Sequence, residues 1–148
     1  MTCLDESAPA ITTTTWQPPT GRHTIRKKFR FAAAHHLTSL PASHRCSGHH
    51  GHTYTVEVFV SSRQLRGPGW ITNVADLKPL GEFIDRCLDH QDLNEVLPVE
   101  PTSEHLAAWI ADWCLDNLVP DLDARFDLVT VDEGGDHVFM FRPDQEPS

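Results

Sequence analysis

The sequence has few positive charges. Its 148 residues include 12 Lys and Arg against 21 Asp and Glu, which gives a formal net charge of -9 with neutral histidines. The one dense basic segment, Arg26-Lys27-Lys28 with Arg30, falls on an expected strand. A broad basic face is therefore absent, and we expect no nucleic-acid partner. An anionic ligand would need local positive charge from a metal ion and a few Lys or Arg side chains.

Long apolar runs and closely spaced cysteines are also missing. No apolar run approaches the roughly 18 to 20 residues that a helix needs to cross a bilayer, so we expect no membrane partner. The N-terminus lacks the basic segment and apolar core of a secretory signal. The four cysteines are widely spaced and include no C-x-x-C pair. This spacing argues against a disulfide framework and for a reducing, cytoplasmic location.

Breaker residues and hydropathy divide the chain into an extension and one domain. Residues 1–22 are rich in Thr and Pro and have no amphipathic period, so we expect a disordered extension. Residues 23–148 are enough to bury a single core. Apolar periods of the helical kind predict helices at 75–88 and 102–117, with a loop at 89–94. Alternation and turn residues predict strands at 24–35, 52–61, 126–133 and 137–142, with a short strand or strand end at 70–73.

The order of the main elements is strand, strand, helix, helix, strand, strand. This order is typical of an α+β fold in which a four-stranded antiparallel sheet carries two helices on one face. Such a sheet has two open edges, and proteins usually cover or pair exposed edges. Joining of sheets between subunits would meet this need, so the fold class favours a homo-oligomer.

Three histidines occupy strand positions that suit a metal site. His50 and His52 share the parity of the apolar positions in the strand that follows, so they project to the same face. His35 shares the parity of Phe31 in the upstream strand. If the two strands pair antiparallel, all three imidazoles meet at one end of a common inner face. Three neutral imidazoles with a fourth position open for water or substrate form a typical catalytic zinc site.

A cysteine accompanies this histidine pattern. Cys46 lies four residues before His50, which places a thiol beside the expected metal. The thiolate is the reactive form of cysteine, and nearby positive charge favours it. Two simpler interpretations stay open at this point. H-x-H is a short pattern that also occurs without a metal, and Cys46 could be an unreactive loop residue.

Several separated motifs, taken together, carry a family resemblance. They are Phe31-x-Ala-Ala-His35-x-Leu37, Cys46-x-x-x-His50-Gly-His52, Leu77-Lys78, Leu88-Asp89-His90-x-x-Leu93-Asn94, Pro101-Thr-Ser-Glu104 and Val131-x-Glu133. In this order and spacing the chain resembles the 6-pyruvoyl-tetrahydropterin synthase and 6-carboxy-tetrahydropterin synthase family over about residues 25–143. The resemblance implies the tunnelling fold, in which the sheets of several subunits join into a barrel. It also implies a homo-hexamer of two stacked trimers with sites at subunit interfaces.

The resemblance also implies roles for the residues that would do chemistry. The three histidines would hold Zn2+, and Cys46 would be the thiolate that abstracts a proton. Asp89 and His90 would form the partner proton relay, supplied by a neighbouring subunit. Judged by its position alone, the same pair could be an ordinary helix C-terminus, where the helix dipole favours a histidine.

Four further residues would contact the substrate, by the same resemblance. Glu133 would anchor a pterin by accepting hydrogen bonds from its amino group and ring N–H. Thr102, Ser103 and Glu104 would lie close to the edge of the pterin ring. Position alone again allows simpler roles: Glu133 could be an exposed hairpin carboxylate, and Thr102 or Ser103 could cap the helix that follows.

Within the family, the three-residue spacer between Cys46 and His50 resembles the bacterial 6-carboxy-tetrahydropterin synthases of the queuosine (7-deazaguanine) pathway. The implied reaction converts 7,8-dihydroneopterin triphosphate to 6-carboxy-5,6,7,8-tetrahydropterin and releases acetaldehyde and triphosphate. Two positions depart from that pattern: Asn73 stands where Asp is usual, and His36 replaces a common Arg. Two alternatives remain, a 6-pyruvoyl-tetrahydropterin synthase and a non-catalytic zinc- or pterin-binding module. The second would gain if Cys46 were a fourth metal ligand.

Overall fold

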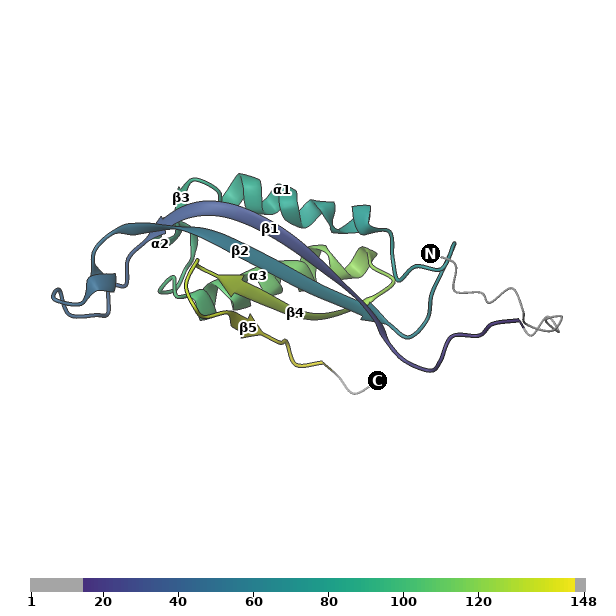
Figure 1. The fold of residues 1–148 in the computed structure, drawn as a ribbon. Helices are drawn as coiled ribbons and strands as arrows, with labels where there is room; N and C mark the ends of the chain where they lie inside the picture. The colour runs from purple at the N-terminus through teal and green to yellow at the C-terminus, as the bar shows by residue number, and fades with distance from the viewer. Residues whose placement is uncertain (1–14, 146–148) are drawn as a thin grey trace, which may run out of the picture.

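The alternating strands of the sequence form a mostly antiparallel sheet. The computed structural model describes residues 15–145, and within them five strands have the order β3-β1-β2-β4-β5 (Figure 1). Every neighbouring pair is antiparallel except β1 and β3, which run parallel. The strands are β1 (His23–His35), β2 (His50–Ser62), β3 (Gln91–Asp92), β4 (Arg125–Asp132) and β5 (Phe139–Phe141).

Two long helices cover one face of this sheet, as predicted (Figure 1). The apolar stripe of α1 is buried, with Leu80 and Ile84 at 0% and 1% exposure, and a proline in its first turn is tolerated there. The side chain of Thr102 caps α3 by accepting from the N–H of His105 at 3.1 Å. The helical elements are η1 (Arg45–Ser47), η2 (Val74–Leu77), α1 (Lys78–Cys87), α2 (Leu93–Val96), α3 (Ser103–Asn117) and η3 (Val119–Asp121).

The core lies between the helices and the inner face of the sheet. Side chains at alternate positions of β2 have 0% exposure, which confirms the predicted parity of that strand. Full burial of each such side chain contributes about 1.5–3 kcal/mol, so the inward face of β2 is strongly fixed. These inward residues are Tyr54, Val56, Val58 and Val60.

Three details of the predicted fold are wrong. The sheet has five strands rather than four, because Gln91 and Asp92 pair with β1 inside the segment predicted as a loop. A third, four-residue helix, α2, follows at once and is capped by the side chain of Asp92. Residues 70–73 form no strand; only an isolated bridge joins Arg66 to Trp70. Elements this short have no period that a sequence pattern could reveal.

Residues 15–22 of the predicted extension contain no helix or strand and are exposed, and the rest of it lies outside the described residues. Among residues 15–145, none of the helices combines the length and apolar character needed to cross a membrane. The barrel and the hexamer implied by the resemblance stay predictions.

One side chain fixes the end of β1 beside the metal-site candidate His35. Asn94 in α2 accepts from the N–H of His36 and donates to its carbonyl, both at 2.9 Å. Replacing Asn94 by Ala removes both bonds and leaves two half-buried backbone groups without a partner. We expect the free energy of unfolding in urea to fall by about 1–3 kcal/mol.

The matched control for this prediction is Asn117→Ala. Asn117 makes one amide bond to the carbonyl of Trp113 at the exposed end of α3, and its loss should cost less than about 0.5 kcal/mol. Equal destabilisation by the two changes would contradict the role given to Asn94.

Candidate active site

The register of β1 and β2 brings the three predicted histidines together. His35 pairs directly with His50, and Ala33 pairs with His52, so all three imidazoles project from one end of the hairpin to its inner face. Their candidate ligand atoms all lie within 4.8 Å of one another. The Nε2 atoms of His35 and His50 are 3.1 Å apart. The side chains that strand parity placed on one face therefore do converge.

Backbone carbonyls hold two of the rings in the orientation that a metal needs. Nδ1 of His35 donates to the carbonyl of Pro101, and Nδ1 of His50 donates to that of Gly48, both at 2.7 Å. Because a carbonyl only accepts, these partners place each ring proton on Nδ1 and leave a lone pair on each Nε2. Two lone pairs 3.1 Å apart repel each other unless a cation lies between them. Tetrahedral zinc with bonds of about 2.0–2.1 Å would separate two nitrogens by about 3.3 Å, so the donor set fits such an ion.

The charge state of His35 also suits a ligand. Burial lowers the pKa of His35, against the raising effect of its hydrogen bond to Pro101, and the neighbouring His50 and His52 lower it further. The neutral imidazole, which is the metal-binding form, is thereby favoured. Imidazole nitrogens suit zinc, copper, iron and nickel, so the three histidines form a possible metal site whose ion they alone do not specify.

A cavity of about 910 Å3 opens beside the histidines. Five residues predicted to do chemistry or contact substrate line it together with the histidines, although they come from distant segments: Cys46, Thr102, Ser103, Glu104 and Glu133. Cys46 is half-buried in η1 and is not part of the group of clustered ligand atoms. The thiol therefore shares the cavity without closing the three-histidine set, as an open site requires.

A serine at the start of α3 orients the carboxylate at the end of β4. Ser103 is 4% exposed, and its hydroxyl donates to Oε2 of Glu133 at 2.9 Å. Glu133 is half-buried and faces the cavity, so it is not simply an exposed hairpin carboxylate. Its free oxygen can accept from N–H donors of a ligand. The hydroxyl of Thr102 caps α3, and Glu104 is exposed at the cavity wall.

Asp89 and His90 lie together but not in this cavity. Oδ1 of Asp89 accepts from the N–H of Ala32 at 2.9 Å, and Oδ2 lies 2.9 Å from Nδ1 of His90. The hydrogen bond from Ala32 lowers the pKa of Asp89, and the contact with His90 lowers it further. His90 has a φ of 58°, which is uncommon for a residue with a side chain.

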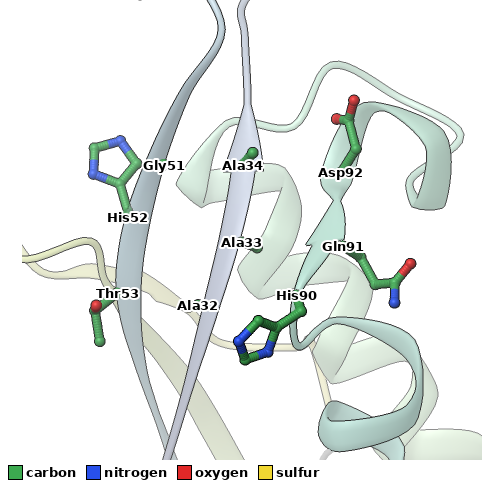
Figure 2. A pocket seen from close by; sticks show the side chains of 9 residues that line it. All are labelled: Ala32, Ala33, Ala34, Gly51, His52, Thr53, His90, Gln91 and Asp92. Carbon is green, nitrogen blue, oxygen red and sulfur yellow. The ribbon is translucent and has the colours of Figure 1, made fainter.

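The side chain of His90 projects into a separate hollow of about 570 Å3 (Figure 2). Both cavities include His52 in their linings. Within one chain the structure thus keeps Asp89 and His90 as a hydrogen-bonded pair, apart from Cys46.

Four residues that line the main cavity were not predicted as site residues from the sequence: Leu37, Arg45, Gly51 and Phe139. Arg45 is the one Lys or Arg among the described residues that line this cavity, so an anionic group entering it would meet positive charge there. Its position directly before Cys46 was the available signal. Phe139 offered none, because its approach to the cavity depends on how β5 pairs with β4.

Comparisons with known proteins agree on one family. A family model described as 6-pyruvoyl tetrahydropterin synthase matches residues 24–144. The chain is 40% identical over 92 residues to a 6-carboxy-5,6,7,8-tetrahydropterin synthase of Synechocystis, covering 58% of this chain and 70% of that protein. It is 33% identical over 76 residues to a dihydroneopterin monophosphate aldolase of Pyrococcus furiosus, covering 51% of this chain and 64% of that protein.

The fold also matches solved structures. The 6-pyruvoyl tetrahydropterin synthase of Caenorhabditis elegans superposes with a TM-score of 0.72 at 20% identity, covering 86% of this chain and 100% of that one. At this identity the match bears on the fold alone, and it agrees with the mostly antiparallel sheet described above.

The geometry predicts that the metal depends on His50. Replacing His50 by Ala removes one of three ligand atoms. Loss of a residue that only supports a metal ligand already lowers metal affinity about tenfold or more, and loss of a ligand should cost at least as much. We therefore expect zinc per chain, measured by mass spectrometry after dialysis, to fall at least about tenfold. The control is His23→Ala, an exposed histidine at the far end of β1, which should keep the full metal content. A His50→Ala protein that retains its zinc would rule out the three-histidine ligand set.

Proposed function

Because the chain belongs to the 6-pyruvoyl tetrahydropterin synthase family, we propose that it converts 7,8-dihydroneopterin triphosphate to 6-carboxy-5,6,7,8-tetrahydropterin, releasing acetaldehyde and triphosphate. The observation that carries this proposal is the shared cavity, where three clustered imidazoles, a thiol and an oriented carboxylate meet. The 40% identical Synechocystis protein, named for this carboxy product, supports the choice of reaction. The proposed setting is 7-deazaguanine biosynthesis in the cytoplasm.

The proposed cofactor is Zn2+ held by His35, His50 and His52, whose donor atoms fit it. When bound, zinc would act as a Lewis acid toward oxygen atoms of the substrate side chain. Glu133 would bind the amino group and ring N–H of the pterin, with Ser103 fixing its carboxylate. These contacts would hold the ring while its side chain points toward the histidines.

Cys46 would act as the base that takes a proton from a carbon of the substrate side chain. It lines the cavity next to the metal ligands, where positive charge from a bound metal ion favours the thiolate. The relay partner would be His90, whose ring is oriented by Asp89 through their 2.9 Å contact. Since this pair does not line the main cavity of its own chain, we propose that it serves the cavity of a neighbouring subunit in a hexamer of two trimers.

The choice between carboxy and pyruvoyl products rests on the Cys46 loop and on the named relatives. Asn73, which departs from the carboxy pattern, caps η2 by accepting from the N–H of Ala75. Aspartate can accept the same hydrogen bond, so the exchange keeps this cap, and Asn73 does not line the cavity. A 6-pyruvoyl-tetrahydropterin synthase remains the second candidate, because the family model carries that description.

The direct test is to incubate the zinc-loaded protein with 7,8-dihydroneopterin triphosphate and identify the pterin product by mass spectrometry. We expect 6-carboxy-5,6,7,8-tetrahydropterin together with acetaldehyde. A 6-pyruvoyl product would establish the second candidate, and a pterin that keeps only a one-carbon hydroxymethyl group of its side chain would indicate an aldolase. Tight pterin binding without turnover would support a non-catalytic binding module.

A mixing experiment tests the shared site. Cys46→Ala and His90→Ala should each lose about 100-fold or more in kcat, since each removes a proton-transfer group, while zinc content stays at the wild-type level. If the two groups come from different subunits, dissociating and reassembling an equal mixture of the inactive variants restores activity at the sites that receive both intact residues. No recovery in the reassembled mixture would show that each chain supplies its own pair.

A further inference from the structure

The carboxylate of Glu100 accepts hydrogen bonds from all four donors of two consecutive loop residues. Oε1 accepts from the hydroxyl of Thr38 at 3.0 Å and also from its N–H. Oε2 accepts from the N–H of Ser39 at 3.1 Å and also from its hydroxyl. These hydrogen bonds of Glu100 with Thr38 and Ser39 are named the Glu100 clamp. Glu100 lies just before α3, whereas Thr38 and Ser39 lie just after β1, so the clamp joins segments about sixty residues apart.

The clamp is stable to protonation. Donation from the Ser39 hydroxyl and the Thr38 N–H, with smaller contributions from their other donors, lowers the pKa of Glu100 to about 2. The carboxylate is therefore ionised at any pH at which the protein would operate, and both oxygens are fully used as acceptors. This arrangement gives no sign that the Glu100 carboxylate transfers protons.

The segment that Glu100 holds begins the stretch of residues 38–46, which ends at Cys46 and is named the thiol loop. Leu37, next to the clamped residues, donates its N–H to the carbonyl of Cys46 at 2.8 Å. Leu37 and Cys46 both line the main cavity. Between them the chain is largely exposed and contains only the three-residue η1, so its position depends on these few bonds.

The neighbour of Glu100 holds a metal-site histidine. The carbonyl of Pro101 accepts from Nδ1 of His35 at 2.7 Å. One dipeptide thus fixes the thiol loop through its carboxylate and the ring of His35 through its next carbonyl.

We propose that Glu100 is a positioning residue that sets the place of Cys46 relative to the histidine cluster. This inference rests on the proposed role of Cys46 as the base, but it concerns a residue outside the motifs that carry the family resemblance. Because proton transfer needs near-contact geometry, a small displacement of the loop would slow the chemical step more than it would weaken substrate binding.

The experiment compares Glu100→Gln and Glu100→Ala with Glu95→Gln in the zinc-loaded protein. Glu95 is an exposed carboxylate of the neighbouring α2 and serves as the matched control. The first readout is the rate at which iodoacetamide alkylates Cys46, followed by peptide mass spectrometry, with half-buried Cys87 as the internal reference. This readout requires no turnover, so it stays informative if the proposed reaction is wrong.

We expect both Glu100 variants to alkylate Cys46 at least about threefold faster, because the loop opens more often, with no change at Cys87. With substrate, kcat should fall roughly 10- to 100-fold while KM changes less than about threefold. Ser39→Ala, which removes one donor and leaves Glu100 in place, should shift both readouts in the same direction by less. Glu95→Gln should match the wild type.

Unchanged Cys46 alkylation in Glu100→Ala would overturn the proposal, whatever the turnover shows. Faster alkylation of Cys87 as well would also overturn it, since the effect would then be general loosening of the fold. If Glu100→Ala does not fold, Ser39→Ala and Glu100→Gln decide: wild-type alkylation and kcat in both would refute the positioning role.

Discussion

The site depends on the antiparallel register of β1 and β2, which sets His35 opposite His50. A slip of one residue would turn every side chain of a strand to the other face and scatter the three imidazoles. The register is held by the apolar positions of β2 that follow, which are fully buried against the helices. Core packing along β2 therefore determines whether the three donor atoms lie within 4.8 Å of one another.

The start of α3 is the second fixed point. Over four consecutive residues, the carboxylate of Glu100 holds the thiol loop, the carbonyl of Pro101 orients His35, Thr102 caps the helix, and Ser103 holds Glu133. Each contact comes from a different atom of a consecutive segment, so a rigid helix N-terminus positions both the proposed metal centre and the proposed pterin anchor. Sites supported by regular elements in this way are held more precisely than sites built on loops alone.

Much of this arrangement could be predicted because it follows from periodicity. Strand parity predicted that His35, His50 and His52 share a face, and capping chemistry predicted Thr102 or Ser103 as the cap of α3, of which Thr102 is the cap. The two-residue β3 and the four-residue α2 are too short to show a period, and the clamp at Glu100 joins distant segments through contacts with no sequence signature. The position of His90 relative to Cys46 was equally out of reach, since parity and spacing describe one chain and the proposed site needs two.

The central claim is an open metal site: three imidazoles bind the ion, and Cys46 stands beside it without coordinating. Zinc K-edge X-ray absorption of the zinc-loaded resting protein tests this directly. The account predicts three nitrogen ligands at about 2.0–2.1 Å with a light oxygen completing the shell. A sulfur ligand at about 2.3 Å would contradict it, because a coordinated thiolate closes the site and is not free to act as a base.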